Sequence, residues 1–284
     1  MDILSERKAL AIAGLRRFTR VVVALSGGVD SAVLLSLAAE ALGAGAVRAV
    51  TGQSGSLPRV DLEDARAVAA HLGVEHQVVE TLEMTRDGYR ANAGDRCFHC
   101  RSELFETLRR VALREGCDGV VYGAIKDDCE DFRPGMRAAE EWGVRAPLLE
   151  AGIDKTNVRT LAAQAGLSVQ AKPAAACLAS RIPTGTEVTV ERLGQVEAAE
   201  TALRGLGFEQ LRVRHHGEIA RLELDGAGLA RMADHELRSR VTGAVKSAGF
   251  RFVAVDLEGY RSGSLNPGRP GGLCRIEPTR EGGQ

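Results

Sequence analysis

The chain has 284 residues, of which 44% are hydrophobic and 26% charged, as in one large or two modest soluble domains. With 37 basic and 38 acidic residues the net charge is −1, which excludes a global attraction to nucleic acid or to anionic membrane. The apolar runs are too short to cross a bilayer, and the N-terminus lacks the pattern of a signal peptide. We therefore expect a cytoplasmic protein with no nucleic-acid or membrane partner.

The first part of the chain alternates helices with short apolar strands. The patterns predict helices over residues 5–18, 30–42, 60–72, 100–115 and 156–165, and strands over residues 21–25, 47–51, 75–79 and 118–122. Residues 124–150 look irregular, with a short helix near 136–142. Strands that are apolar throughout and joined to helices by short links are typical of a buried parallel sheet. The predicted fold class is therefore α/β, with a doubly wound parallel sheet.

A turn-rich segment between Lys172 and Pro183 leads into a smaller second unit. Its patterns predict a helix over 187–206, a hairpin of 210–214 with 220–224, a helix over 229–248 and a strand over 252–257. The expected domains are therefore an ATP-binding domain at 1–183, a small α/β domain at 184–262 and a disordered Gly- and Pro-rich tail at 263–284.

A glycine-rich loop joins the first predicted strand to the second helix and has the sequence Ser26-Gly27-Gly28-Val29-Asp30-Ser31. Glycines let the backbone turn tightly and expose its N–H groups, and the positive helix end favours phosphate. Two hydroxyls add donors, and Asp30 would act through Mg²⁺. The alternative is a glycine turn with an Asp or Ser helix cap.

This loop resembles the PP-loop of the N-type ATP pyrophosphatases. That resemblance implies cleavage of ATP to AMP and pyrophosphate, with AMP left on a substrate oxygen. The chain has no Gly-x-x-x-x-Gly-Lys-Ser/Thr segment, which argues against transfer of the γ-phosphate.

Three of the six cysteines can act together. Cys97 and Cys100 stand at the front of a predicted helix, and Cys177 follows the fourth strand. Both segments come after strands, at the edge where such sheets bind ligands, so the thiols are expected to meet beside ATP. Three thiolates leave one position open on a [4Fe-4S] cluster or on zinc.

The alternative is a pair of buried cysteines and an unrelated third. Among the remaining cysteines, Cys117 is interpreted as a core residue and Cys274 as a tail thiol, while Cys129 lies in an acidic loop with no assigned role. Disulfides are not expected in a cytoplasmic chain.

Several further segments together resemble the LarE family over about residues 5–265. Besides the loop they are Gly123 with Asp128 and Asp131 to Gly135, Ala176 to Arg181, Leu211 to His216 with Ile219 to Glu223, and Gly259 to Gly263. The resemblance implies sulfur transfer to the carboxylates of pyridinium-3,5-biscarboxylic acid mononucleotide, a precursor of the nickel-pincer nucleotide of lactate racemase.

The resemblance also implies roles for individual residues. It places Cys177, Asp30, Ser180 and Arg181 in the catalytic set. In one branch of the family the cysteine at position 177 gives up its own sulfur. Because this chain adds Cys97 and Cys100, it is similar to the three-cysteine branch, in which a sulfide on a [4Fe-4S] cluster is the donor and an external sulfide source refills it.

Basic and acidic groups of the second unit complete the expected site. Arg212, Arg214 and Arg261 can form forks to phosphate and carboxylate, although a strand with solvated arginines is the alternative. The resemblance implies a divalent metal at Glu200 and Glu223 near an oligomer interface, and a homohexamer. Asp128 and Asp131 fit contacts to metal or ribose as well as a plain acidic loop.

Other function classes stay open from the sequence alone. A tRNA thiolase would share adenylation and sulfur delivery but would want a wide basic surface. An amide-forming synthetase would leave the cysteines without a role, and a non-enzymatic nucleotide-binding module would carry structural zinc. Sacrificial transfer from Cys177 without a cluster is a further alternative.

Overall fold

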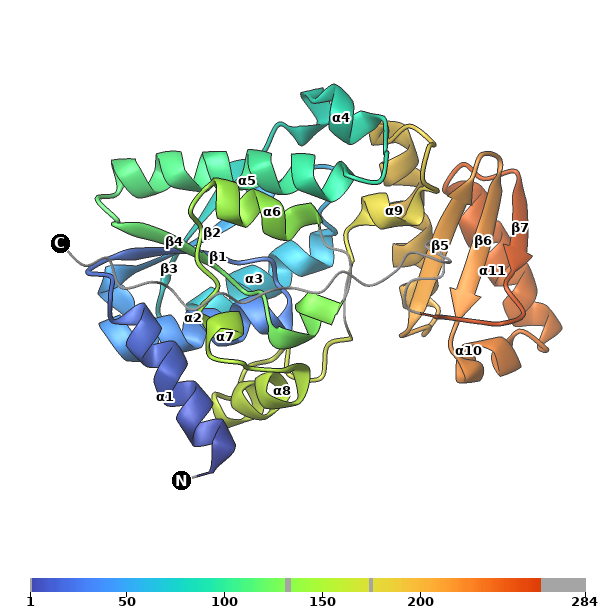
Figure 1. The fold of residues 1–284 in the computed structure, drawn as a ribbon. Coiled ribbons are helices and arrows are strands. Elements are labelled where there is room, and N and C mark those ends of the chain that lie inside the picture. The colour runs from blue at the N-terminus through green and yellow to red at the C-terminus, as the bar shows by residue number, and fades with distance from the viewer. Residues whose placement is uncertain (1, 131–133, 174–175, 262–284) are drawn as a thin grey trace.

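The computed structural model describes residues 2–130, 134–173 and 176–261 (Figure 1). Predictions made for Asp131, for Cys274, for the Cys129 side chain and for the tail at 263–284 lie outside these residues. The first unit holds strands β1 (Val21–Ala24), β2 (Val47–Gln53), β3 (Glu75–Glu80) and β4 (Gly119–Tyr122). Its helices are α1 (Ile3–Leu15), α2 (Val29–Leu42), α3 (Arg59–His71), α4 (Asp87–Arg90), α5 (Arg96–Arg114), α6 (Pro134–Glu141), α7 (Pro147–Glu150) and α8 (Lys155–Gln164).

The four strands form one parallel sheet in the order β3-β2-β1-β4. Helices α5 and α6 cover one face of this sheet, and α1, α2, α3 and α8 cover the other (Figure 1). The prediction of a doubly wound parallel sheet is therefore confirmed. The neighbouring strands β1 and β4 lead to helices on opposite faces of the sheet: α2 follows β1 and α6 follows β4. The loops after these two strands therefore diverge, and a ligand site lies between them.

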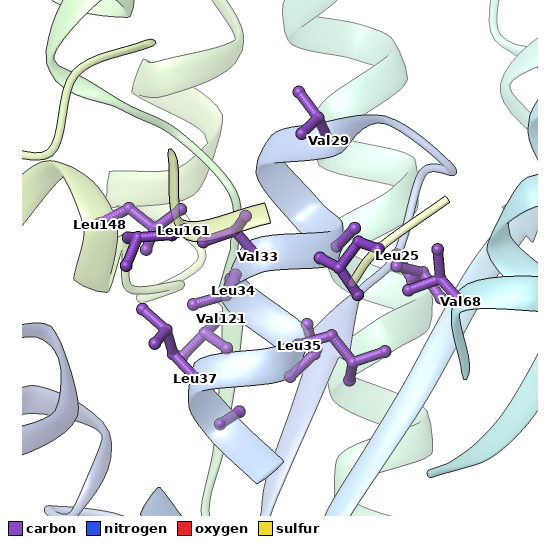
Figure 2. Packing of buried hydrophobic residues seen from close by; sticks show 14 of the residues in the cluster. Leu25, Val29, Val33, Leu34, Leu35, Leu37, Val68, Val121, Leu148 and Leu161 are labelled. Atoms are coloured by element: carbon purple, nitrogen blue, oxygen red, sulfur yellow. The ribbon is translucent and has the colours of Figure 1, made fainter. Parts of the chain in front are cut away.

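Alternating side chains of β1 explain the two cores of this unit. Val21 and Val23 pack with α2 and α3, whereas Val22 and Ala24 pack under α5. Figure 2 shows the first core around Leu34 of α2, which is fully buried. A strand buried on both faces explains why its sequence is apolar throughout rather than alternating.

The second unit holds α9 (Val190–Gly205), β5 (Leu211–His216), β6 (Ile219–Leu224), α10 (Gly226–Arg231), α11 (His235–Ser247) and β7 (Phe252–Val255). Strands β5 and β6 form the predicted antiparallel hairpin, and β7 pairs with β6 in parallel. Its hydrophobic core also takes in Tyr89 and Leu178 from outside the unit.

The prediction of one helix over 229–248 was wrong, because α10 ends at Arg231 and α11 begins at His235. The side chain of Asp234 accepts a hydrogen bond from the backbone N–H of Leu237 and starts the second helix. An Asp in this position favours a helix N-cap over a helix interior. The structure also adds α7, which lies within the stretch predicted to be irregular. Among the described residues, no helix has the length and apolar character needed to cross a membrane.

Candidate active site

The loop between β1 and α2 is closed by hydrogen bonds of its two serines. Ser31 Oγ donates to the carbonyl oxygen of Gly28 at 3.0 Å and accepts from the backbone N–H of Ser26 at 3.1 Å. The two hydroxyl oxygens lie 3.1 Å apart. The loop opens into the N-terminus of α2, where the helix dipole and free N–H groups favour an anion. This geometry suits a phosphate group.

Two glycines allow close approach of the backbone around this loop. Gly27 has a φ of +74°, and a Cβ atom there would lie 1.9 Å from the carbonyl oxygen of Asp61. Gly123 follows β4, and a Cβ atom there would lie 2.8 Å from the backbone nitrogen of Ser31. Larger side chains at either position would push the neighbouring segments away from the loop.

Two lysines that the sequence reasoning missed attach to the same loop. Lys155 Nζ donates to both carboxylate oxygens of Asp30, at 2.8 and 2.9 Å. Lys172 Nζ donates to the carbonyl oxygen of Gly27 at 3.0 Å and to Asp61 Oδ1 at 2.8 Å. In a sequence, a lysine that binds a loop looks the same as a lysine exposed to solvent. No local pattern therefore indicated either residue. The role of Asp30 as a Mg²⁺ ligand stays a prediction. In this structure the Asp30 carboxylate forms an ion pair with Lys155.

The three singled-out cysteines lie where the two units meet. Cys97 and Cys100 are the second and fifth residues of α5, and Cys177 directly precedes a short 3₁₀ helix at Leu178–Arg181. Cys97 is exposed, while Cys100 and Cys177 are partly buried against the core of the second unit. Burial raises the pKa of the Cys100 thiol, and the charges of Glu83, Cys177 and Cys97 raise this pKa further. Negative charge on Cys97 or Cys177 therefore acts on the Cys100 thiol.

Buried polar groups line the surroundings of these thiols. Glu83 is 2% exposed and accepts a hydrogen bond from Ser56 Oγ at 3.2 Å. Tyr89 is 1% exposed, and burial together with the charge of Cys177 raises the pKa of its phenol. The backbone N–H of Leu178 donates to the carbonyl oxygen of Ser56 at 2.9 Å. These contacts fix the Cys177 segment beside the segment that follows β2.

Within the described ranges, no three His, Cys, Asp or Glu side chains are grouped as the ligands of a metal ion. The three-cysteine cluster thus stays a prediction. Cys117 lies apart from these thiols, partly buried against the core under α5.

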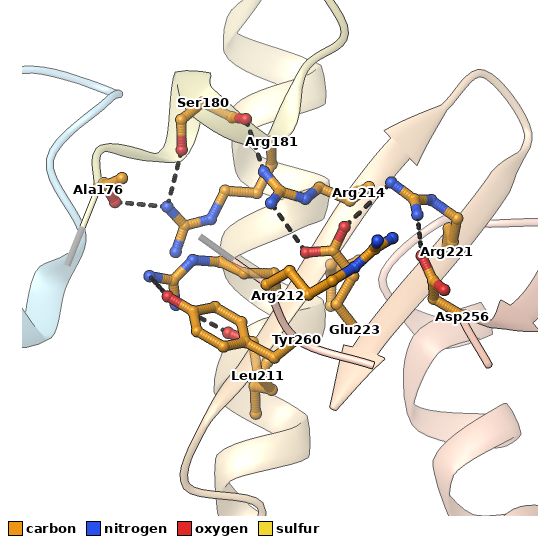
Figure 3. A network of polar contacts seen from close by, with 12 residues as sticks. Ala176, Ser180, Arg181, Leu211, Arg212, Arg214, Arg221, Glu223, Asp256 and Tyr260 are labelled. Carbon is orange, nitrogen blue, oxygen red and sulfur yellow. Dashed lines mark hydrogen bonds and ion pairs between the residues drawn. The ribbon is translucent and has the colours of Figure 1, made fainter. Parts of the chain in front are cut away.

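A chain of buried ion pairs connects the Cys177 segment to the second unit (Figure 3). Arg181 donates to both oxygens of Glu200, at 2.8 and 3.0 Å, and the two side chains are 2% and 1% exposed. Burial alone would raise the pKa of Glu200, but the charges of Arg181 and Arg204 outweigh it and hold this pKa below its usual value. Arg181 also donates to the carbonyl oxygen of Cys177 at 3.0 Å.

The second carboxylate of this network, Glu223, is held by Arg214 at 2.8 Å and by Arg221 at 3.0 Å. Arg214 further donates to the carbonyl oxygen of Ser180 at 2.9 Å (Figure 3). Glu200 and Glu223 therefore serve as partners of buried arginines. Their assignment as metal ligands stays a prediction, and these ion pairs disfavour it.

A pocket of about 270 Å³ opens between the two units. Its charged lining comes from both of them and consists of Asp61, Asp64, Lys172, Arg181, Arg204 and Arg212, together with Glu209. Figure 3 shows the guanidinium groups of Arg181 and Arg212 next to each other on the side of Ala176. Burial and the nearby positive charge of Arg181 lower the pKa of Arg212. Guanidinium groups gathered in this way create a positive potential that attracts an anionic ligand.

The three arginines predicted to bind substrate have different partners. Arg212 lines the pocket and stacks on the ring of Tyr260, with its guanidinium carbon 5.1 Å from the ring centre. Arg214 belongs to the ion-pair network, and Arg261 pairs with Glu258 at the surface, 2.5 Å away. Arg204 is a pocket residue that the sequence reasoning missed, because its helical position resembles an ordinary surface arginine.

Comparisons with known proteins show which families this chain resembles. The sequence model of the NAD synthase family matches residues 12–112. An uncharacterized protein of Synechocystis sp. is 43% identical over 247 residues, covering 87% of this chain and 92% of that protein. The pyridinium-3,5-bisthiocarboxylic acid mononucleotide synthase of Lactiplantibacillus plantarum is 38% identical over 267 residues, covering 94% of this chain and 96% of that enzyme. A tRNA-specific 2-thiouridylase of Rhizorhabdus wittichii is 31% identical over 240 residues, covering 70% of this chain and 62% of that enzyme.

The first two relatives match nearly their whole length, so the likeness includes the second unit as well as the phosphate loop. The family model, by contrast, matches only the region around that loop. The chain belongs to the LarE family of ATP-dependent sulfur transferases, within the PP-loop ATP pyrophosphatase superfamily.

Proposed function

We propose that this protein uses ATP to convert carboxylates of pyridinium-3,5-biscarboxylic acid mononucleotide into thiocarboxylates through an acyl-adenylate. One observation carries the proposal. The charges of Cys97 and Cys177 act on the Cys100 thiol, which packs against the core of the second unit, in a chain 38% identical to a pyridinium-3,5-bisthiocarboxylic acid mononucleotide synthase. Sulfur-bearing groups next to an adenylation site are what such a reaction needs.

The first step is adenylation of the substrate. A carboxylate oxygen of the substrate attacks the α-phosphorus of ATP, the bond to pyrophosphate breaks, and AMP remains on that oxygen. The N–H groups of the loop and the hydroxyls of Ser26 and Ser31 hold the phosphates. Asp30 is the residue that would hold Mg²⁺, and Lys155 contributes positive charge at the same place.

The second step replaces the activated oxygen by sulfur. A sulfur nucleophile attacks the acyl carbon, and AMP leaves with the oxygen. Cys97, Cys100 and Cys177 would hold a [4Fe-4S] cluster, because thiolates are the usual ligands of such clusters. When bound, the cluster would supply a sulfide as the sulfur nucleophile. Burial makes a thiolate at Cys100 costly by itself, and a bound metal centre would compensate that cost.

The pocket between the units suits an acidic mononucleotide. Arg212 presents its guanidinium group to the pocket, and Arg204, which also pairs with Glu200, adds positive charge at its edge. Guanidinium groups bind carboxylates and phosphates by paired hydrogen bonds. The pocket also reaches Ala176, the neighbour of Cys177, and Lys172, which touches the phosphate loop. A substrate in this pocket would therefore lie between the nucleotide and the sulfur source.

Anaerobic purification tests the proposal directly. Iron, acid-labile sulfide and the visible and EPR spectra would be measured first, and then AMP, pyrophosphate and thiocarboxylate after addition of ATP, substrate and sulfide. Cys97→Ser, Cys100→Ser and Cys177→Ser should each abolish repeated turnover, whereas Cys117→Ser is the matched control. A colourless protein that iron and sulfide cannot reconstitute contradicts the cluster. Loss of hydrogen sulfide from Cys177 by mass would then indicate the sacrificial route.

A second candidate is thiolation of tRNA, favoured by the match to a tRNA-specific 2-thiouridylase over 70% of this chain. Such an enzyme binds RNA through many phosphate contacts, so its affinity falls steeply with salt. A mobility-shift titration with bulk tRNA at two salt concentrations separates the candidates. Tight, salt-sensitive binding would favour the thiolase.

We also propose that the protein assembles as a homo-oligomer, a hexamer by family resemblance. Light scattering of the purified protein measures this directly, and a monomeric mass would contradict it.

A further inference from the structure

The corner between α4 and α5 is built around a strained, buried asparagine. Asn92 has a φ of +52°, unlike every other non-glycine residue in the described part of the chain, and it is 1% exposed. Its carboxamide nitrogen donates to the carbonyl oxygens of Pro183 at 2.8 Å, Thr186 at 2.9 Å and Ile182 at 3.3 Å. Asn92 therefore ties the start of α5 to the chain that follows the Cys177 segment.

Arg96, the first residue of α5, contacts the Cys177 segment directly. Its Nη1 donates to the carbonyl oxygen of Ala179 at 2.9 Å and to the side-chain oxygen of Asn92. Ala179 stands two positions after Cys177, and Arg96 is next to Cys97 in sequence. One partly buried guanidinium thus contacts both of the segments that carry the thiols.

The electrostatics agree with this placement. Arginine stays protonated under all ordinary conditions, so its charge is a fixed feature of the site. Three thiolates in a half-buried place repel one another, and a fixed positive charge nearby offsets that repulsion.

We propose that Arg96 is a positioning residue for sulfur delivery: it holds Cys177 in register with Cys97 and Cys100 and supplies the positive charge that their thiolates share. Asn92 orients the guanidinium for this task. The inference rests on the proposed function, because it concerns the group that these thiols hold. Groups that orient metal ligands from outside commonly change metal retention by about 10- to 100-fold.

The test measures iron retention rather than activity. Anaerobically reconstituted wild-type protein would be mixed with a chelator, and the decay of its visible absorption and the rate of iron release recorded. Arg96→Gln should release iron about 10- to 100-fold faster, and Asn92→Gly should also release it faster while keeping the left-handed backbone. Arg96→Lys should restore part of the retention because it keeps the charge. Arg110→Gln, on the exposed face of the same helix, is the matched control and should behave like wild type.

The outcomes separate the two ideas. If wild-type protein takes up no iron, or the Cys97, Cys100 and Cys177 variants retain it equally well, the proposed function fails. If wild-type retention depends on these cysteines but Arg96→Gln and Asn92→Gly release iron at the wild-type rate, the positioning role is overturned. A lysine variant no better than an equally well folded glutamine variant would overturn the charge contribution, and the Asn92→Gly variant tests the positioning role independently of Arg96→Gln.

Discussion

Replacing Gly27 by alanine perturbs one defined contact of the phosphate loop. The φ of Gly27 is +74°, which costs a residue with a side chain about 1–2 kcal/mol. The new Cβ would also stand 1.9 Å from the backbone oxygen of Asp61, so α3 must move, and overpacking of this kind costs about 1–3 kcal/mol. We expect Gly27→Ala to lower the free energy of unfolding by about 2–5 kcal/mol and to abolish measurable ATP binding.

The neighbouring glycine provides the matched comparison. A Cβ on Gly28, at φ −88°, would meet only Ser26 Oγ at 3.4 Å. We therefore expect Gly28→Ala to change the stability by less than about 1 kcal/mol. Urea unfolding followed by fluorescence of the single tryptophan, Trp142, measures both variants, and calorimetry measures ATP binding. Equal stability of the two variants would refute the argument from the backbone.

Two substitutions and one labelling experiment test other parts of the site. Glu200→Gln should cost about 3–5 kcal/mol at pH 7, because it leaves buried Arg181 without its partner. Folding lowers the pKa of Glu200 from 4.5, so its contribution to the free energy of unfolding is complete above pH 4.5. This contribution is lost as the pH falls through the pKa of the folded state. The unfolding curves of variant and wild type should therefore converge in acid. Divergence in acid would contradict this. Lys172→Met should weaken ATP binding by about tenfold, because it removes a charged hydrogen bond to the loop. Lys246→Met, at an exposed position, should leave ATP binding unchanged. Calorimetry measures the affinity of both variants for ATP. In metal-free folded protein at pH 8, iodoacetamide should label exposed Cys97 before the partly buried Cys100, whose pKa is raised, and urea should remove the difference. Peptide mass spectrometry that finds Cys100 labelled first would refute this.

The local parts of the fold were predictable because their causes are local. Val21 to Ala24 is apolar on every residue because both faces of β1 are buried, and the loop after it needs Gly27 for its positive φ. The break at Asp234 was missed because the apolar spacing of α10 continues into α11, so periodicity alone does not separate them. The cap of the second helix decided that boundary.

The sequence by itself determined the chemistry that this chain brings: a phosphate loop at Ser26–Ser31 and three cysteines after strands of a parallel sheet. It also carried enough likeness to place the chain in its family. Only the tertiary structure decided which charges meet. Lys155 reaches Asp30 across 125 positions and Lys172 reaches Gly27 across 145, while Arg96 reaches Ala179 across 83. The physical reason is that an ion pair depends on distance in space and on burial, and neither is encoded in the spacing of single charged residues along a chain.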